Sequence, residues 1–452
     1  MFHKVLIANR GEIAIRIIRA CHDLGVRAVV AYSEADRYSL AVRMADEAVC
    51  IGPAAPARSY LNPSALISAA LITGCEAIHP GYGFLSENPY FADICADCNL
   101  VFIGPSGDAI RKMGDKALGR ITMRKAGIPT VPGSEAELRS VEEALELART
   151  IGYPILLKPS AGGGGRGMRV ANDDSELVKG FPIARAEAEA AFGNGGLLLE
   201  KYLAEVRHVE IQVLADSYGH AIHLGERDCS AQRRHQKIVE ESPSPAVTPK
   251  LRKRMGRDAL HGIAAIGYSN AGTLEFLLTP DGHYYFIEMN TRIQVEHPVT
   301  ELVTGIDLVA WQLRIAAGER LTIRQQDVEL RGHAIECRIN AEDPAQGFMP
   351  SFGEIEHFLP PGGPNVRCDS HLYPGYTPPR NYDSLMAKII TWGCDRPEAL
   401  ARMRRALNET VITGIQTTIP FQQAMLNDPP FQEGYNSTRY VPELLERWKD
   451  KQ

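Results

Sequence analysis

The sequence predicts an α/β protein of several domains. Short apolar runs typical of strands alternate with amphipathic stretches typical of helices, which is the pattern of a parallel sheet covered by helices. The chain has 452 residues, enough for about three domains. Hydrophobic residues make up 44% and charged residues 23% of it. This composition is that of a globular protein and excludes disordered, collagen-like and disulfide-scaffold classes.

The first unit, residues 1–113, has the pattern of a Rossmann-like domain. An apolar run over residues 5–8 ends at Asn9-Arg10-Gly11, and helical spacing of apolar residues follows as far as Leu24. Further strands are predicted at 26–31, 77–78 and 100–103, with a helix at 64–73. The first turn lacks the GxGxxG fingerprint, so a nicotinamide site is not expected there.

Residues 114–130 are predicted to be a linker, and residues 131–203 a small α+β domain. A charged helix is expected over 142–150 and a strand over 154–158, and the strand ends at Lys158. The loop after it carries glycine at positions 162–165 and 167 around Arg166. Consecutive glycine N–H groups can surround phosphate oxygens, which favours a phosphate-binding loop over a flexible linker. Its spacing is not that of a Walker A loop.

The third unit, residues 204–452, is predicted to be a large mixed α/β body. Strands are expected at 209–213 and 284–289. A helix is expected after Asp395, because Glu398 completes a capping-box pattern and Pro397 lies in the first turn.

A hairpin in this body predicts a metal site. Residues 273–278 and 283–289 flank a Pro-Asp-Gly turn, and a turn centred on Asp281-Gly282 places Glu275 opposite Glu288. Their Cβ atoms would lie about 5 Å apart, so a cation is expected between them. Asn290 would share their face and complete an all-oxygen set suited to Mg²⁺ or Mn²⁺. The alternative is a solvent-facing acidic edge.

Polar residues occupy every second position from Glu288 to Glu296. In an extended chain they would share one face. A solvated strand has the same pattern, but the order of metal ligands, the anion-binding Arg292, the amide Gln294 and the terminal carboxylate Glu296 favours a site in which Glu296 is a base.

Charge and cysteine content narrow the other possibilities. The net charge is −6, so the basic cluster at 227–237 is better explained by an anion pocket or a charged loop than by nucleic-acid binding. Nine scattered cysteines suit reduced thiols. Neither a membrane-spanning helix nor a secretory leader is expected, and the predicted location is the cytoplasm.

The motifs resemble those of biotin carboxylase subunits of the ATP-grasp superfamily. The resemblance runs through residues 7–14, 79–88, 162–168, 226–237, 286–298 and 331–338. It implies a biotin carboxylase N-terminal domain, a mobile ATP-grasp lid at 131–203 and a C-terminal ATP-grasp body. It also implies that ATP phosphorylates bicarbonate to carboxyphosphate, whose carboxyl group passes to N1′ of biotin.

The resemblance also implies roles for individual residues. The positions similar to ATP-binding residues are Lys116, Lys158, Gly164, Gly165, Glu200, Lys201, Leu203, His208, Gln232, His235, Glu275 and Glu288. Glu275, Glu288 and Asn290 would hold two Mg²⁺ or Mn²⁺ ions. The catalytic positions would be Lys237 and Arg292, which with the backbone of Val295 cradle bicarbonate, Glu296 as the base, and Arg338, which stabilises the biotin enolate. Tyr82 and Gln294 would lie near the ureido ring.

The partners follow from the same resemblance. The chain has no Ala-Met-Lys-Met motif, so biotin is expected on a separate carrier protein, with carboxyltransferase subunits elsewhere. A homodimer that supplies acetyl-CoA carboxylase is expected. The final acceptor stays open, and another acyl-CoA carboxylase or a two-subunit pyruvate carboxylase is the alternative. An ATP-grasp ligase for a different acid and a regulatory nucleotide-binding module are the remaining rivals.

Overall fold

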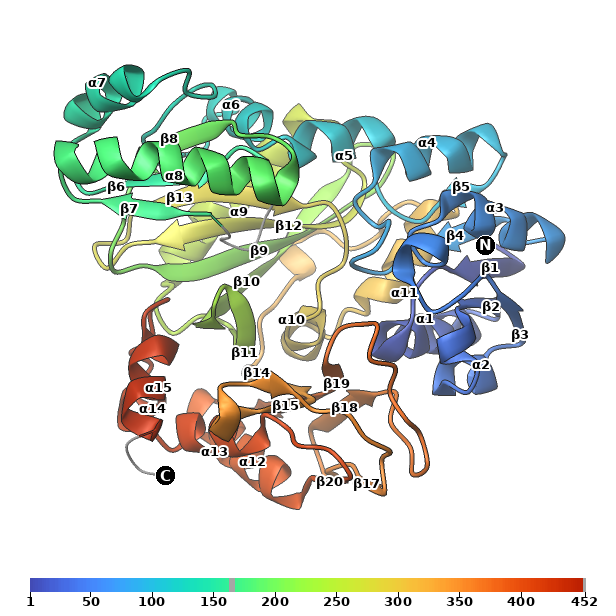
Figure 1. The fold of residues 1–452 in the computed structure, drawn as a ribbon. Helices are drawn as coiled ribbons and strands as arrows, with labels where there is room; N and C mark the ends of the chain where they lie inside the picture. The colour runs from blue at the N-terminus through green and yellow to red at the C-terminus, as the bar shows by residue number, and fades with distance from the viewer. Residues whose placement is uncertain (162–166, 450–452) are drawn as a thin grey trace.

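The N-terminal strands form a five-stranded parallel sheet of order β3-β2-β1-β4-β5 in the computed structural model, which describes residues 1–161 and 167–449 (Figure 1). The strands are β1 (Lys4–Ile7), β2 (Arg27–Tyr32), β3 (Glu47–Cys50), β4 (Ala77–His79) and β5 (Val101–Phe102). The helices of this unit are α1 (Gly11–Asp23), α2 (Leu40–Met44), α3 (Pro63–Ile72), α4 (Pro89–Asp97) and α5 (Gly107–Gly114). The predicted parallel α/β arrangement is confirmed.

The segment predicted to be a linker contains a helix, α6 (Lys116–Lys125), capped by Asp115. Its buried face includes Arg120 and Met123, so this segment packs against the rest of the chain.

The second unit is a three-stranded antiparallel sheet covered by two helices. The sheet has the order β7-β6-β8, with β6 (Ile155–Pro159), β7 (Arg169–Ala171) and β8 (Leu197–Lys201). Helices α7 (Val141–Ile151) and α8 (Asp174–Phe192) pack on it in a hydrophobic cluster drawn entirely from residues 138–199. A separate core of this kind suits a lid that moves as a unit. The predicted glycine loop, with Gly164 and Gly165, lies outside the described residues.

An eight-stranded antiparallel sheet runs through the rest of the molecule, in the order β13-β12-β9-β10-β11-β14-β19-β18 (Figure 1). Its strands are β9 (Arg207–Ala215), β10 (Ala221–Arg233), β11 (Gln236–Ser242), β12 (Asn270–Leu278), β13 (Tyr284–Asn290), β14 (His333–Asn340), β18 (Val366–Ser370) and β19 (Leu385–Gly393). The helices are α9 (Pro249–Ala265), α10 (His297–Thr304), α11 (Leu308–Ala316), α12 (Arg396–Glu409), α13 (Ile419–Leu426), α14 (Pro429–Gln432) and α15 (Tyr440–Lys449). Two small strand pairs, β15 (Glu342–Asp343) with β16 (Met349–Pro350) and β17 (His357–Leu359) with β20 (Val411–Thr413), complete the body.

The hairpin of β12 and β13 has the predicted acidic pair but a different register near its turn. Glu275 pairs with Glu288, whereas Phe276 pairs with Phe286. Ile287 is therefore an extra residue, a bulge that shifts the register by one position. The unbulged hairpin assumed from the sequence is wrong between the turn and the acidic pair, although it identified that pair correctly.

The extended face predicted from residue 288 to 296 does not continue past Asn290. Strand β13 ends there, residues 291–296 form a loop, and α10 begins at His297. The amide of Gln294 still reaches Glu275, with 2.9 Å between Nε2 and Oε1, because the loop folds back toward β12. The polar side chains thus converge through a turn and not through strand alternation.

The remaining local predictions agree with the structure. Helix α12 is capped by Asp395, which accepts from the Glu398 N–H at 2.9 Å, while the Glu398 carboxylate accepts from the N–H of Cys394. None of the helices in the described part of the chain has the length and apolar character that crossing a membrane requires.

Candidate active site

Three carboxylates surround the ammonium group of Lys237 in the middle of the large sheet. Its Nζ lies 2.7 Å from Glu210, 2.9 Å from Glu275 and 2.6 Å from Glu296. Burial lowers the pKa of Lys237, but the three carboxylates outweigh burial and raise the pKa well above its usual value. Lys237 is therefore a fixed positive charge at the centre of the site.

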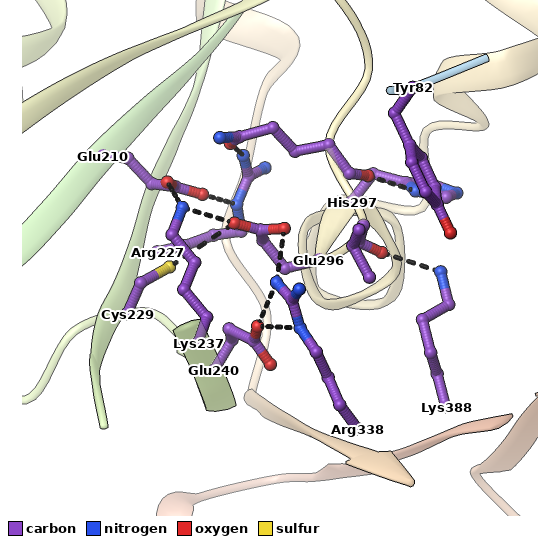
Figure 2. A network of polar contacts seen from close by, with 12 residues as sticks. Tyr82, Glu210, Arg227, Cys229, Lys237, Glu240, Glu296, His297, Arg338 and Lys388 are labelled. Carbon is purple, nitrogen blue, oxygen red and sulfur yellow. Dashed lines mark hydrogen bonds and ion pairs between the residues drawn. The ribbon is translucent and has the colours of Figure 1, made fainter. Parts of the chain in front are cut away.

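Glu296 bridges two cations (Figure 2). One oxygen accepts from Lys237, and the other lies 3.0 Å from Nη2 of Arg338. Burial raises the pKa of Glu296, but Lys237, Arg338 and Arg227 together bring it well below its ordinary value. The carboxylate is thus ionised, which is the form that accepts a proton.

Arg227 organises the floor of this cluster, a role that the sequence did not reveal. Its side chain is fully buried and donates to Glu210 at 2.5 Å, to Gln294 at 2.8 Å and to Thr300 at 3.0 Å, as well as to two further side chains. The cluster at 227–237 was predicted to be an anion pocket or a charged loop. The segment is a strand, a tight turn and a second strand, so the charged-loop alternative is wrong outside the turn, whereas the anion pocket, which would include Lys237, stays a prediction. Its first arginine is a structural cation.

The acidic pair on the hairpin has the chemistry of a divalent cation site. The carboxylate of Glu288 makes no hydrogen bond or ion pair with any other residue in the described ranges. Burial and then the neighbouring Glu275 raise the pKa of Glu288, whereas Lys237 and His208 outweigh burial and lower that of Glu275. A cation would relieve the repulsion between the two carboxylates. Asn290 Nδ2 lies 2.9 Å from Glu275 Oε1, so the three predicted ligands are adjacent.

Arg292 is held by a residue of the N-terminal unit. Its Nε donates to Glu87 Oε2 at 2.9 Å, and its Nη2 donates to Asn290 Oδ1 at 2.9 Å. Glu87 also accepts from the backbone N–H of Thr291 at 3.0 Å. Glu87 was not predicted, because nothing in its local sequence indicates a partner 205 residues away.

Several predicted ATP residues lie together. Lys158 and Glu200, on neighbouring strands of the lid, form a buried ion pair that Arg120 joins, with 2.6 Å between Nη1 and Oε1. Burial, with Arg120 and Lys116 nearby, lowers the pKa of Lys158 even though Glu200 opposes this. Lys116 is the first residue of α6, which packs against β13 of the hairpin. Its charge lowers the pKa of Glu288, although burial and Glu275 outweigh this.

The other predicted nucleotide residues divide into two groups. Near the hairpin, His208 lies 3.0 Å from Glu275 and accepts at Nδ1 from Gln232 at 2.8 Å. His235 lies at the β10–β11 turn, where burial and, to a smaller extent, the nearby His208 lower the pKa of His235. On the lid, Lys201 donates to the backbone oxygens of Gly152 and Tyr153, and Leu203 follows β8. The structure does not bring Lys201 into contact with the hairpin group.

Two of the predicted biotin residues, Arg338 and Tyr82, lie near each other, whereas Gln294 contacts Arg227 and Glu275. Besides Glu296, Arg338 donates through Nε to Glu240 Oε1 at 2.6 Å. The hydroxyl of Tyr82 donates to Glu12 at 2.6 Å. Burial and Glu12 raise the pKa of Tyr82, and the nearby Arg338 opposes part of this rise. Figure 2 shows a chain of polar contacts from Glu210 through Lys237 and Glu296 to Arg338 and Glu240, while Lys388 reaches a backbone oxygen on the other side of Arg338.

Cys229 contributes little chemistry at this site. Its thiol is fully buried, and burial, followed by Glu210, raises its pKa well above the usual value. A thiol that stays protonated is a poor nucleophile and a poor metal ligand.

Family models match three consecutive parts of the chain. A biotin carboxylase N-terminal domain matches residues 1–110, the ATP-binding domain of the carbamoyl-phosphate synthase L chain matches residues 115–324, and a biotin carboxylase C-terminal domain matches residues 336–443.

Known proteins match over almost the whole chain. The biotin carboxylase of Nostoc sp. is 58% identical over 443 residues, which cover 98% of this chain and 99% of that protein. Biotin carboxylase 1 of Bacillus subtilis is 57% identical over 442 residues, which cover 98% of each chain. A Campylobacter jejuni biotin carboxylase complex with β,γ-ATP has a TM-score of 0.95 at 48% identity and covers 98% of this chain and 99% of its own.

The biotin carboxylase domain dimer of Hydrogenobacter thermophilus 2-oxoglutarate carboxylase, in complex with MgADP, ADP and bicarbonate, has a TM-score of 0.94 at 51% identity. It covers 98% of this chain and 99% of its own. Full-length identity above half, together with the matching fold and the convergent polar site, leads to one conclusion: the chain belongs to the biotin carboxylase family of ATP-dependent ligases.

Proposed function

We propose that this chain uses ATP and bicarbonate to carboxylate biotin on a separate carrier protein, as the first half-reaction of an acetyl-CoA carboxylase. The observation that carries the assignment is the placement of Glu296. An ionised carboxylate lies between Lys237 and Arg338, beside the loop that carries Arg292 and Val295. None of the other reaction classes considered from the sequence requires Lys237, Arg292, Glu296 and Arg338 together.

In the first step, Glu296 removes the proton of bicarbonate, and a bicarbonate oxygen attacks the γ-phosphorus of ATP while the bond to ADP breaks. Bicarbonate is a poor nucleophile, so a base and two cations that hold its oxyanions supply complementary help. Lys237 and Arg292 are the cations. An anion that takes a hydrogen bond from Lys237 weakens the Lys237–Glu296 pair and so raises the basicity of Glu296.

Glu275, Glu288 and Asn290 would hold the Mg²⁺ or Mn²⁺ that accompanies ATP, two ions in the full complex. Such an ion neutralises phosphate charge. The support is the opposed pair of carboxylates on the hairpin, in which Glu275 is paired with Lys237 but Glu288 has no cationic partner among the described residues.

The predicted nucleotide residues cover the phosphates and base. Lys116 and Lys158 supply positive charge at the phosphates, and Glu200, Lys201, Leu203, His208, Gln232 and His235 line the rest of the nucleotide site. The lid with Gly164 and Gly165 closes over it. Carboxyphosphate hydrolyses readily in water, so closure also protects the intermediate.

In the second step, carboxyphosphate yields the carboxyl group and phosphate, the phosphate removes the N1′ proton of biotin, and N1′ takes the carboxyl group. Arg338 stabilises the negative charge on the ureido oxygen, with Tyr82 and Gln294 at the ring. Arg338 is suited to this role because Glu240 and Glu296 hold its guanidinium in place at Nε and Nη2.

The acceptor could equally be a keto acid. The 2-oxoglutarate carboxylase domain at 51% identity, and a biotin carboxylase subunit of pyruvate carboxylase at 52% identity, favour this second candidate. A homodimer is proposed from the dimer named for the first of these relatives.

The test measures ADP release by the purified protein with MgATP, bicarbonate and free biotin. Release that requires both bicarbonate and biotin is expected. ADP release that does not depend on biotin would contradict the proposal and indicate a ligase for another acid. Adding carrier and carboxyltransferase subunits from the same source, and assaying for carboxylated acetyl-CoA or a carboxylated keto acid, then decides the acceptor.

A further inference from the structure

One buried ammonium group has no role in the assignments above. Lys388 lies on β19, and its side chain is fully buried. Its Nζ donates to the backbone oxygen of Val295 at 2.7 Å and lies 3.1 Å from Glu12 Oε1. Figure 2 shows it reaching the loop before α10, on the opposite side of Arg338 from Lys237.

The same carboxylate contacts the biotin side of the site. Glu12 lies in the first turn of α1, and its Oε1 accepts from the hydroxyl of Tyr82 at 2.6 Å. One short chain of contacts therefore joins the carbonyl of Val295, Lys388, Glu12 and Tyr82. It connects three parts of the protein that are distant in sequence: the N-terminal unit, the loop at 291–296 and the C-terminal strand β19.

A buried charge at the position of Lys388 lowers the stability of the sheet, so we expect it to have a functional role. It is the direct cross-strand partner of Arg338 on β14, a like charge that destabilises a sheet, and of Asp369 on β18, an opposite charge that offsets part of this cost. Burial also lowers the pKa of Lys388, but Glu12 and Glu336 outweigh this and raise it, so the cation persists. Lysine is almost never fully buried unless its charge is paired.

The two opposed cations hold adjacent residues of one loop. Arg338 binds the carboxylate of Glu296, and Lys388 binds the carbonyl of Val295. The carbonyl that precedes Glu296 and the carboxylate of Glu296 itself are thus both held, which fixes the orientation of the base.

We propose that Lys388 is a positioning residue that aligns the bicarbonate cradle and the biotin side of the site with each other. Through Val295 it fixes the loop that presents the base, and through Glu12 it fixes Tyr82. This inference rests on the proposed function, because it uses the bicarbonate and biotin roles assigned there.

The main variant is Lys388→Met, whose unbranched apolar side chain fills similar space without charge. A displacement of the reacting groups by about 1 Å can cost on the order of 10²-fold in rate, so we expect at least a ~10-fold rise in KM for bicarbonate and a ~10-fold or larger fall in biotin-dependent kcat. KM for ATP should stay within about twofold, because Lys388 contacts no predicted nucleotide residue.

Glu12→Gln is the matched control. Its amide oxygen can still accept from Tyr82 and from Lys388, and the bond from Lys388 to Val295 remains. We expect KM for bicarbonate to be that of the unmodified protein, and any change to be confined to KM for biotin. Lys388→Met leaves Glu12 buried without its cation, so the double variant Lys388→Met/Glu12→Gln removes both charges and is the version to assay if the single variant does not fold.

The outcomes are distinct when thermal unfolding and circular dichroism show folded proteins. A selective rise in KM for bicarbonate in both Lys388 variants, absent in Glu12→Gln, supports the proposal. Unchanged KM for bicarbonate, or an equal rise in KM for ATP and bicarbonate, overturns it and makes Lys388 a core residue only. Failure of the proposed function is separate, because the unmodified protein would then show no ADP release dependent on bicarbonate and biotin.

Discussion

Replacing Glu296 with Gln removes the proposed base while leaving its surroundings largely intact. Lys237 keeps Glu210 and Glu275, and Arg338 keeps Glu240. The glutamine oxygen can still accept one hydrogen bond. The free energy of unfolding should therefore fall by no more than about 2 kcal/mol, the scale of one hydrogen bond to a charged group.

The catalytic loss should be much larger. Loss of a general base costs about 10²- to 10⁴-fold in rate, which corresponds to roughly 3–5 kcal/mol of activation free energy. Bicarbonate- and biotin-dependent ADP release should fall by that factor, with KM for ATP nearly unchanged. The control is Glu240→Gln, which removes the other carboxylate of Arg338. Burial raises the pKa of Glu240 to about 7 despite the opposing Arg338, so at neutral pH this substitution removes less negative charge than Glu296→Gln does.

The control should retain activity within about tenfold, since Glu240 does not touch Lys237. The assignment of Glu296 as base is refuted if its glutamine variant keeps more than a tenth of the activity, or if the loss lies entirely in KM for ATP.

Three further predictions concern buried charges of the large sheet, two of them beside Lys237 or Glu210 and one at Glu241, which pairs with His333 and Arg396. Arg227→Met should lower the free energy of unfolding in urea by about 3–5 kcal/mol, because it removes one of the two cations beside the buried carboxylate of Glu210 and the hydrogen bonds to four other side chains. A loss under about 1 kcal/mol would contradict the organising role given to it. Glu275→Gln should raise the Mg²⁺ concentration for half-maximal activity at least ~10-fold, and an unchanged value would remove this residue from the metal site. Burial raises the pKa of Glu241, but His333 and Arg396 outweigh burial and lower it from 4.5 in the unfolded chain to about 2. Ionised Glu241 therefore contributes about 3 kcal/mol to the free energy of unfolding above pH 5. This contribution is lost as the pH falls from about 4.5 toward 2. The stability gap between the unmodified protein and Glu241→Gln should therefore narrow below pH 4.5 in urea titrations, and a constant gap would contradict the pairing.

Local sequence patterns predicted what local physics determines. The parallel strands of the first unit, the Asp395 cap and the Glu275–Glu288 pair all depend on residues within a few positions of each other or across one turn. The boundaries of the hairpin were less predictable, because the bulge at Ile287 reflects packing that the alternation of residues does not encode. The boundaries between the three units stay predictions.

What the sequence could not show is the set of residues that hold the reacting groups in place. Glu87, Glu12 and Lys388 contact the site from far along the chain, and each alone has the pattern of an ordinary surface or helix residue. Their roles depend on the N-terminal unit and β19 meeting the loop at 291–296, which is a tertiary event. Because that loop is neither strand nor helix, backbone hydrogen bonds such as the one from His297 N–H to the oxygen of Gln294 do little to fix its geometry. Charged side chains from outside the loop must fix its geometry. Buried charges that would only destabilise a sheet elsewhere therefore serve here to hold the carboxylate of the base in one orientation.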